Sequence, residues 1–216
     1  MSVNVRDDAK RSNNKILIYD CTLREGSQAS GVSFSLRDKI KITELFDDIG
    51  FTYTEGGWPG SNLKDRRYFE EIKSVNLKQI KVVGFGRTRL RGIHAEDDAN
   101  LKNLIEAGLS CGHIFGKGWD FHVETALRMS LQENLDAVHE SVSFLKKHLE
   151  EVSFGVEHFF DAYKNNPEYA LKVIDAAVSA GVDWIDLPDT NGGCFPFEVA
   201  EIVAKITDQY EIPFGV

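Results

Sequence analysis

The chain has 216 residues, with 25 basic and 34 acidic side chains and a formal net charge of −9 at pH 7. Hydrophobic residues make up 42% and charged residues 27%, which is typical of a soluble globular protein and excludes a disordered chain. The acidic balance argues against a nucleic-acid partner, and no apolar run approaches the ~18 residues that predict a membrane span.

Residues 1–14 are polar and lack the apolar stretch of a signal peptide. They predict a disordered tail before a single domain that covers residues 15–216. The three cysteines, Cys21, Cys111 and Cys194, are odd in number and far apart in the chain. This pattern predicts free thiols in a reducing, cytoplasmic compartment.

Seven short apolar runs predict β-strands. They start at Ile16, Phe51, Ile80, Cys111, Val152, Asp183 and Pro213. The starts lie 29–41 residues apart, and apolar residues recur with a helical period in the segments between them. This alternation is typical of consecutive βαβ units in a parallel sheet.

Helices are predicted in several of these segments. Ser35 and Asp38 form a capping box for a helix that ends at Gly50. Its predicted buried face comprises Ile42, Leu45, Phe46 and Ile49. A longer helical stretch covers roughly Phe121 to Leu149.

The last two predicted helices each begin with a proline at the first helical position. One has Asn166 as its N-cap, starts at Pro167 and ends at Gly181. Its predicted buried residues are Ala170, Ile174, Ala177 and Val178. The other starts at Pro196 and repeats Val199, Ile202, Val203 and Ile206.

An open doubly wound sheet and a (β/α)8 TIM barrel both use such units. Long loops after strands (Asp20–Leu36, Glu55–Asp65, Gly84–Asp98) and short ones after helices favour the barrel. No GxGxxG turn follows the first strand, which weakens the nucleotide-binding alternative. A barrel needs about 250 residues, so we expect an incomplete one, truncated after about six βα units and the start of the seventh strand.

The first predicted strand runs directly into Arg24 and Glu25. A carboxylate beside a cation at a strand's mouth suits a site in which Glu25 binds a divalent ion and Arg24 stabilises an oxyanion. A salt bridge that closes the barrel rim is the structural alternative. With the barrel topology, we expect polar residues at several strand ends to converge, namely Asp20, Arg24, Glu55, Glu157 and Asp189.

Five motifs in series carry a resemblance to a known family. They are TLREG at 22–26 with Gln28, EGGWPGSN at 55–62, IFGK at 114–117 with Trp119 and Asp120, EHFFD at 157–161, and DTNGG at 189–193. From about Ile16 to its end, the chain resembles the metal-dependent barrel enzymes that comprise 2-isopropylmalate, homocitrate and citramalate synthases and hydroxymethylglutaryl-CoA lyases. Segment 55–62 and the later motifs resemble the citramalate synthase branch.

The resemblance implies a Claisen-type condensation of acetyl-CoA with a 2-oxo acid, which is pyruvate in the citramalate branch of isoleucine and branched-chain amino acid biosynthesis. It implies a divalent metal (Mg²⁺, Mn²⁺ or Zn²⁺) that chelates the oxo acid and polarises its carbonyl. It also implies acetyl-CoA as co-substrate and a homodimer for the complete enzyme.

The same resemblance assigns roles to individual residues. Arg24 would stabilise the alkoxide, Glu25 would be a metal ligand and Glu55 would orient the arginine. Gln28 would lie near the oxo acid, Thr190 would bond its carboxylate, and Glu157 would handle a proton or place the substrate. Many members have aspartate at the position of Glu25, and the glutamate resembles homocitrate synthases, which leaves the choice of oxo acid open.

Other residues that could carry chemistry keep two interpretations. His122 and His158 could contact a ligand, or they could be neutral structural side chains. The arginines at 87, 89 and 91 could bind the phosphates of coenzyme A, or they could form a solvated, charge-balanced loop. Cys21 and Cys194 lack a paired base that would make either a nucleophile. The strand positions of Phe85, Phe115 and Trp184 predict core side chains.

In this family two further metal ligands come from a His-x-His motif at the end of the seventh strand, which here would lie beyond Val216. We therefore expect the 216-residue chain by itself to be inactive. A homocitrate or 2-isopropylmalate synthase is the alternative enzyme. An inactive barrel fragment that acts only as a binding or assembly module is the alternative from another class.

Overall fold

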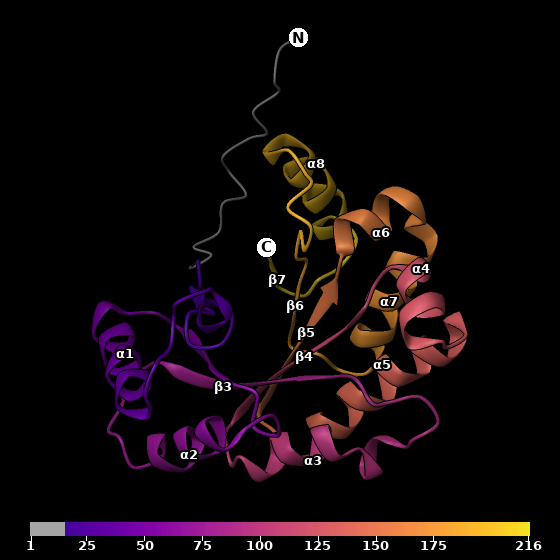
Figure 1. Cartoon of the computed structure of the whole chain (residues 1–216). Coiled ribbons are helices and arrows are strands. Elements are labelled where there is room, and N and C mark those ends of the chain that lie inside the picture. Colours follow the sequence, from indigo (N-terminus) through magenta and orange to yellow (C-terminus); the bar gives the residue numbers. More distant parts are fainter. Residues whose placement is uncertain (1–15) are drawn as a thin grey trace.

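The computed structural model describes residues 16–216, so the predicted tail over residues 1–14 lies outside the described residues. Within residues 16–216, seven parallel strands form one sheet in chain order. They are β1 (Tyr19–Asp20), β2 (Tyr53–Gly57), β3 (Lys81–Arg87), β4 (Cys111–Lys117), β5 (Glu151–Glu157), β6 (Trp184–Asp186) and β7 (Phe214–Gly215). The sheet curls with its helices outside (Figure 1), which confirms the predicted incomplete TIM barrel.

Each strand is followed by a loop or short turn and, up to β6, by at least one helix. The α-helices are α1 (Leu36–Ile49), α2 (Leu63–Ile72), α3 (Ala99–Glu106), α4 (Asp120–His122), α5 (Leu131–Lys146), α6 (Phe159–Asn165), α7 (Pro167–Ser179) and α8 (Pro196–Thr207). Short 3-10 turns cover Gly26–Gln28 and Ala95–Asp97. Among residues 16–216, no helix has both the length and the apolar character needed to cross a bilayer.

The two edge strands are shorter than their sequences predict. Only Tyr19 and Asp20 of the first apolar run pair with β2, opposite Tyr53 and Thr54. The three residues before them, Ile16, Leu17 and Ile18, are 84%, 49% and 44% exposed. An edge strand has a partner on one side only, so apolar composition does not suffice to extend its ladder.

The main hydrophobic core lies between β4–β6 and the helices that cover them. Phe154 on β5 and Ala170, Ile174 and Ala177 on α7 are completely buried in it. Asn166 caps α7 by accepting a hydrogen bond from the backbone of Tyr169, and Pro167 is its first residue. The predicted start and buried face of this helix are therefore confirmed, although Val178 is only half-buried.

The predicted buried face of α1 is only partly confirmed, with Ile42 and Phe46 half-buried, whereas its capping box and its Gly50 terminus are confirmed. Leu45 and Ile49 are 55% and 57% exposed, whereas the helix buries Lys39, Thr43 and Asp47. Apolar periodicity misleads here because each buried polar group finds a specific partner.

Two of these buried groups, Lys39 and Asp47, connect α1 to neighbouring parts of the chain. The Lys39 ammonium donates to the carbonyl of Gly56 at 2.7 Å and pairs with Asp65 at 2.5 Å. Asp47 accepts hydrogen bonds from the backbone N–H groups of residues 78, 79 and 80, just before β3. Polar contacts therefore set the position of α1 against β2 and β3.

The predicted helix from Phe121 to Leu149 is interrupted. After α4, the chain forms a π-helical turn over Val123–Leu127 and then places Arg128 in the left-handed region at φ 56°. Ser130 starts α5 as its N-cap by accepting from the backbone of Glu133. Arg128 therefore ends one helical segment and Ser130 begins the next. Apolar spacing alone does not reveal this interruption.

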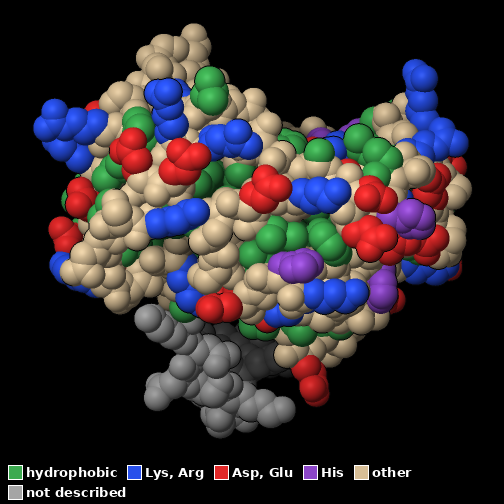
Figure 2. All heavy atoms as spheres, turned by 90° about the horizontal axis from the view of Figure 1, so that it is seen from below, with side chains coloured by type: hydrophobic (Ala, Val, Ile, Leu, Met, Phe, Trp, Pro, Cys, Tyr) green, Lys and Arg blue, Asp and Glu red, His purple; other side chains and the backbone are tan. Residues whose placement is uncertain are grey.

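The outer surface carries mixed charge. On the face seen in Figure 2, basic and acidic side chains are interspersed and do not separate into large patches of one sign. The three arginines at the end of β3 and in the loop after it follow the same pattern. Arg87 pairs with Asp98 at 3.1 Å, Arg89 with Glu140 at 2.5 Å and Arg91 with Glu133 at 3.7 Å. This favours the charge-balanced interpretation of that loop over a site for coenzyme A phosphates.

Candidate active site

A cavity of about 810 Å³ opens at the carboxyl ends of the strands. All six residues with a predicted role line it, namely Arg24, Glu25, Gln28, Glu55, Glu157 and Thr190. Asp20 and Asp189 instead bond within their own loops, Asp20 to Thr22 and Asp189 to the backbone of Gly193 and Cys194. Three of the five residues expected to converge therefore line one cavity, and two shape the loops around it.

Arg24 is held on three sides in the loop after β1. Its Nε donates to Glu55, and its Nη1 donates to Glu25 at 2.6 Å. The guanidinium carbon lies 3.6 Å from the centre of the Phe85 ring, a cation–π contact. Burial alone would lower the pKa of Arg24, but Glu55 and Glu25 raise it, so the group is a fixed cation.

Glu55 lies beneath the arginine on β2 and is only 1% exposed. Its second oxygen accepts a hydrogen bond from the hydroxyl of Tyr19 at 2.8 Å. Burial raises the pKa of Glu55, while its bonds with Arg24 and Tyr19 act in the opposite direction. With both oxygens engaged, this carboxylate serves as a support for Arg24 and has no free oxygen for a ligand.

Glu25, by contrast, faces open space at the mouth, where its side chain is 61% exposed. Gln28, in the 3-10 turn that follows, donates to the same Glu25 oxygen as Arg24, at 3.3 Å. Among the described residues, no group of three or more His, Cys, Asp or Glu side chains converges as a metal site would require. Residues 16–216 therefore offer one carboxylate ligand but not a coordination set.

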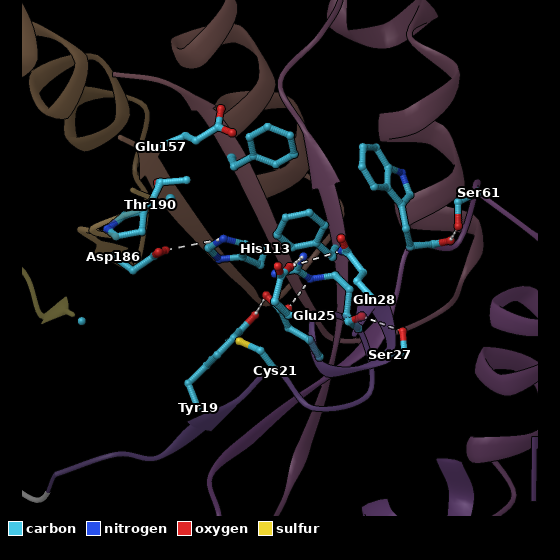
Figure 3. Close-up of a pocket in the computed structure, with 18 of the residues that line it drawn as sticks. Tyr19, Cys21, Glu25, Ser27, Gln28, Ser61, His113, Glu157, Asp186 and Thr190 are labelled. Atoms are coloured by element: carbon cyan, nitrogen blue, oxygen red, sulfur yellow. Dashed lines mark hydrogen bonds and ion pairs between the residues drawn. The ribbon is translucent and has the colours of Figure 1, made fainter. Parts of the chain in front are cut away.

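The opposite wall carries Glu157 and Thr190 (Figure 3). Glu157 ends β5 and forms an ion pair with Lys117, its partner in register on β4. The Thr190 hydroxyl oxygen accepts from the backbone N–H of His158 at 2.9 Å, so its own hydrogen is available to another acceptor. His158 itself adopts a left-handed conformation at φ 58°.

The two histidines of the upper rim lie together but do not line the cavity. The rings of His122 and His158 are 4.6 Å apart, edge to face, and His158 Nδ1 is 3.4 Å from Asp161. Burial and the neighbouring His158 lower the pKa of His122. This arrangement favours the structural interpretation of both side chains.

The floor of the cavity holds residues that sequence patterns did not identify. His113 on β4 and Asp186 at the end of β6 meet there, with Nε2 and Oδ1 3.5 Å apart. The available signal was a polar residue inside each apolar run, His113 in CGHIF and Asp186 in DWIDL. The prediction of core positions for Phe85, Phe115 and Trp184 is incomplete, because all three line the cavity.

Comparison with known proteins gives a consistent result. The family model described as HMGL-like matches residues 15–216. The (R)-citramalate synthase of Aquifex aeolicus is 49% identical over 197 residues, which is 91% of this chain and 37% of that protein. The 2-isopropylmalate synthase of Sulfolobus acidocaldarius is 32% identical over 90% of this chain and 48% of its own length. The chain thus spans less than half of these relatives.

Among solved structures, the Bacillus subtilis HMG-CoA lyase superposes with a TM-score of 0.70. The alignment covers 91% of this chain and 65% of the lyase, at 18% sequence identity. At that identity the similarity concerns the fold alone. The lyase is a barrel of the same kind, and this chain aligns with part of it.

Proposed function

The chain belongs to the HMGL-like family, and from this membership we propose that the protein condenses acetyl-CoA with pyruvate to give (R)-citramalate and free CoA. One water is consumed, because the new thioester is hydrolysed after the carbon–carbon bond has formed. The observation that carries the proposal is the placement of Arg24, Glu25 and Gln28 across one cavity from Glu157 and Thr190. The proposal includes a role in branched-chain amino acid synthesis, in the cytoplasm and as a homodimer.

The charges of the cavity support pyruvate over a dicarboxylic oxo acid. Among the described lining residues, Arg24 is the one Lys or Arg side chain, and it is already bonded to two glutamates. A distal carboxylate, as in 2-oxoglutarate, would need a second cation. The aromatic rings of Trp58, Phe85 and Phe115 instead offer an apolar wall for a methyl group.

In the proposed reaction the chain's residues act at distinct atoms. The Thr190 hydroxyl donates to the carboxylate of pyruvate, and Gln28 forms a hydrogen bond with the bound pyruvate from the other side. Glu157, with its charge balanced by Lys117, accepts a proton from the acetyl methyl group. The resulting carbanion attacks the keto carbon, and Arg24, held by Glu55, stabilises the alkoxide that forms.

A divalent metal is part of this proposal, with Glu25 as one ligand. Bound to the oxo acid, the metal would polarise the keto carbonyl as a Lewis acid. The exposed Glu25 oxygen fits this role, but the described residues do not complete the site. The candidate ions are Mg²⁺, Mn²⁺ and Zn²⁺.

The test is release of free thiol from acetyl-CoA by residues 1–216 expressed together with the remaining length that the citramalate synthase relatives have. It is measured with and without pyruvate and with each of the three metals. We expect pyruvate-dependent release and a product that co-elutes with (R)-citramalate on a chiral column. Thiol release with 2-oxoisovalerate but not with pyruvate would favour the 2-isopropylmalate alternative. Release that does not depend on any oxo acid would contradict the proposal.

A further inference from the structure

The floor of the cavity contains a pair of titratable groups that the proposed reaction does not use. His113 is 4% exposed, and its Nδ1 lies 2.9 Å from the Ser153 hydroxyl. Its Nε2 faces Asp186 Oδ1, and this oxygen is buried with no hydrogen-bond partner among the described residues. Figure 3 shows the two side chains pointing toward one another across the base of the cavity.

The space above this pair depends on a glycine. Gly155 on β5 lies between the two strands, and in register it faces Phe115 on one side and Asp186 on the other. A Cβ atom at this position would lie 3.0 Å from His113 Nε2 and 3.1 Å from Asp186 Oδ1. Because residue 155 has no side chain, the Asp186 carboxylate stays open to whatever occupies the lower part of the cavity.

Within residues 16–216, no positive charge in direct contact neutralises this carboxylate. Burial and the field of Arg24 lower the pKa of His113 to about 3, so the ring is neutral at physiological pH. Burial and the nearby Glu55 raise the pKa of Asp186 to about 7, while Arg24 acts in the opposite direction. Tyr19 faces the pair from β1 as a neutral phenol, and the registered neighbours on β5 and β7 are Gly155 and Gly215.

We propose that Asp186 is a specificity-determining residue, which together with His113 rejects 2-oxo acids that carry a second carboxylate. The inference rests on the proposed function, because it concerns which oxo acid the same cavity accepts. The side chain of a 2-oxo acid that is held between Arg24 and Thr190 and points into the cavity extends toward the aromatic wall or toward this floor. The methyl group of pyruvate is too short to reach Asp186. A distal carboxylate would instead approach the Asp186 carboxylate without a counter-ion.

The experiment separates charge from length. It compares 2-oxoglutarate with 2-oxopentanoate, a 2-oxo acid of the same chain length that lacks the second carboxylate, and uses pyruvate as the reference. Both kcat/KM and calorimetric affinity are measured on the protein at the full length of its citramalate synthase relatives. The unchanged protein is compared with Asp186→Asn and with Asp48→Asn. Asp48 is an exposed carboxylate on α1 that pairs with Lys78, so its substitution controls for a change in net charge.

In Asp186→Asn we expect the ratio of kcat/KM for 2-oxoglutarate to kcat/KM for 2-oxopentanoate to rise at least about tenfold. In Asp48→Asn this ratio should change little. In the unchanged protein the same ratio should rise as the pH falls through about 7, because Asp186 gains a proton. In Asp186→Asn this dependence should disappear. The pH series needs no variant, so the test holds even if the substitution impairs folding.

A ratio that is unchanged in Asp186→Asn and flat with pH would overturn the inference. A protein that binds the oxo acids but releases no thiol would contradict the proposed function, and the ratio of affinities would still decide the role of Asp186. A protein that binds none of the three acids with Mg²⁺, Mn²⁺ or Zn²⁺ present would contradict both.

Discussion

The guanidinium carbon of Arg24 lies 3.6 Å from the centre of the Phe85 ring. With Glu55 bonded to Nε and Glu25 to Nη1, the group has one orientation available to it. The planar fork stacks on the ring as a compact ammonium could not. A cation that is already oriented costs no reorganisation when an oxyanion develops beside it.

Arg24→Lys should therefore lower kcat sharply. Loss of one oxyanion donor typically costs about 100- to 1000-fold in rate, and we expect a reduction in this range with little change in the affinity for acetyl-CoA. Steady-state kinetics together with calorimetry would check both values. A kcat within a few-fold of the parent would mean that Arg24 only closes the rim of the barrel.

The charge on Glu55 can be measured through Cys21. Burial and then the negative Glu55 raise the pKa of Cys21 to about 12, which keeps its reactive thiolate scarce. Glu55→Gln removes that charge, so the pKa of Cys21 should fall and its alkylation by iodoacetamide near pH 9 should accelerate several-fold. Mass spectrometry would follow the modification, with buried Cys111 as the internal control. An unchanged rate would indicate that Glu55 is protonated in the folded protein.

Asp47 is expected to contribute to stability through the three backbone donors before β3. Asp47→Ala should lower the free energy of unfolding by about 2–3 kcal/mol. Asp48→Ala, next in the chain and exposed, should change it by less than about 0.5 kcal/mol. Urea denaturation of both variants would measure the difference, and equal effects would contradict the assignment.

The hydrogen bonds of Asp47 also predict how the free energy of unfolding depends on pH. Burial alone would raise the pKa of Asp47, but its backbone donors lower it below the ordinary value. Its contribution is therefore present above the unfolded pKa of about 3.9 and is lost as the pH falls through the lower folded value. Between pH 6 and pH 3, Asp47→Ala should lose less stability than the parent does. A parallel loss in both proteins would show that other carboxyl groups dominate.

Metal binding by residues 1–216 alone should be weak, because the described residues supply Glu25 and no converging set. Calorimetric titration with Mn²⁺ should give an affinity that falls further in Glu25→Gln and is unchanged in Glu44→Gln, an exposed acid on α1. A tight site that persists in Glu25→Gln would place the ligands elsewhere, and His122 and His158 would then be the first to test.

Local signals in the sequence predicted the elements that depend on local chemistry. Asn166 followed by Pro167 defines the start of α7, whereas the interruption at Arg128 depends on a left-handed residue that no pattern reveals. In the site, Arg24 was predictable because it lies in the loop that follows the first strand. His113 and Asp186 were not, because their pairing depends on three strands in register over Gly155.

Lys39 helps to set the shape of the cavity, although it does not line it. It lies on α1, behind the sheet, yet it binds Asp65, whose other oxygen accepts from the backbone N–H of Trp58 at 3.1 Å. The aromatic wall is therefore set in part from the outer layer of the barrel. A substitution in that layer could change which substrates fit while leaving every lining residue intact, so comparisons of relatives restricted to the lining would miss it.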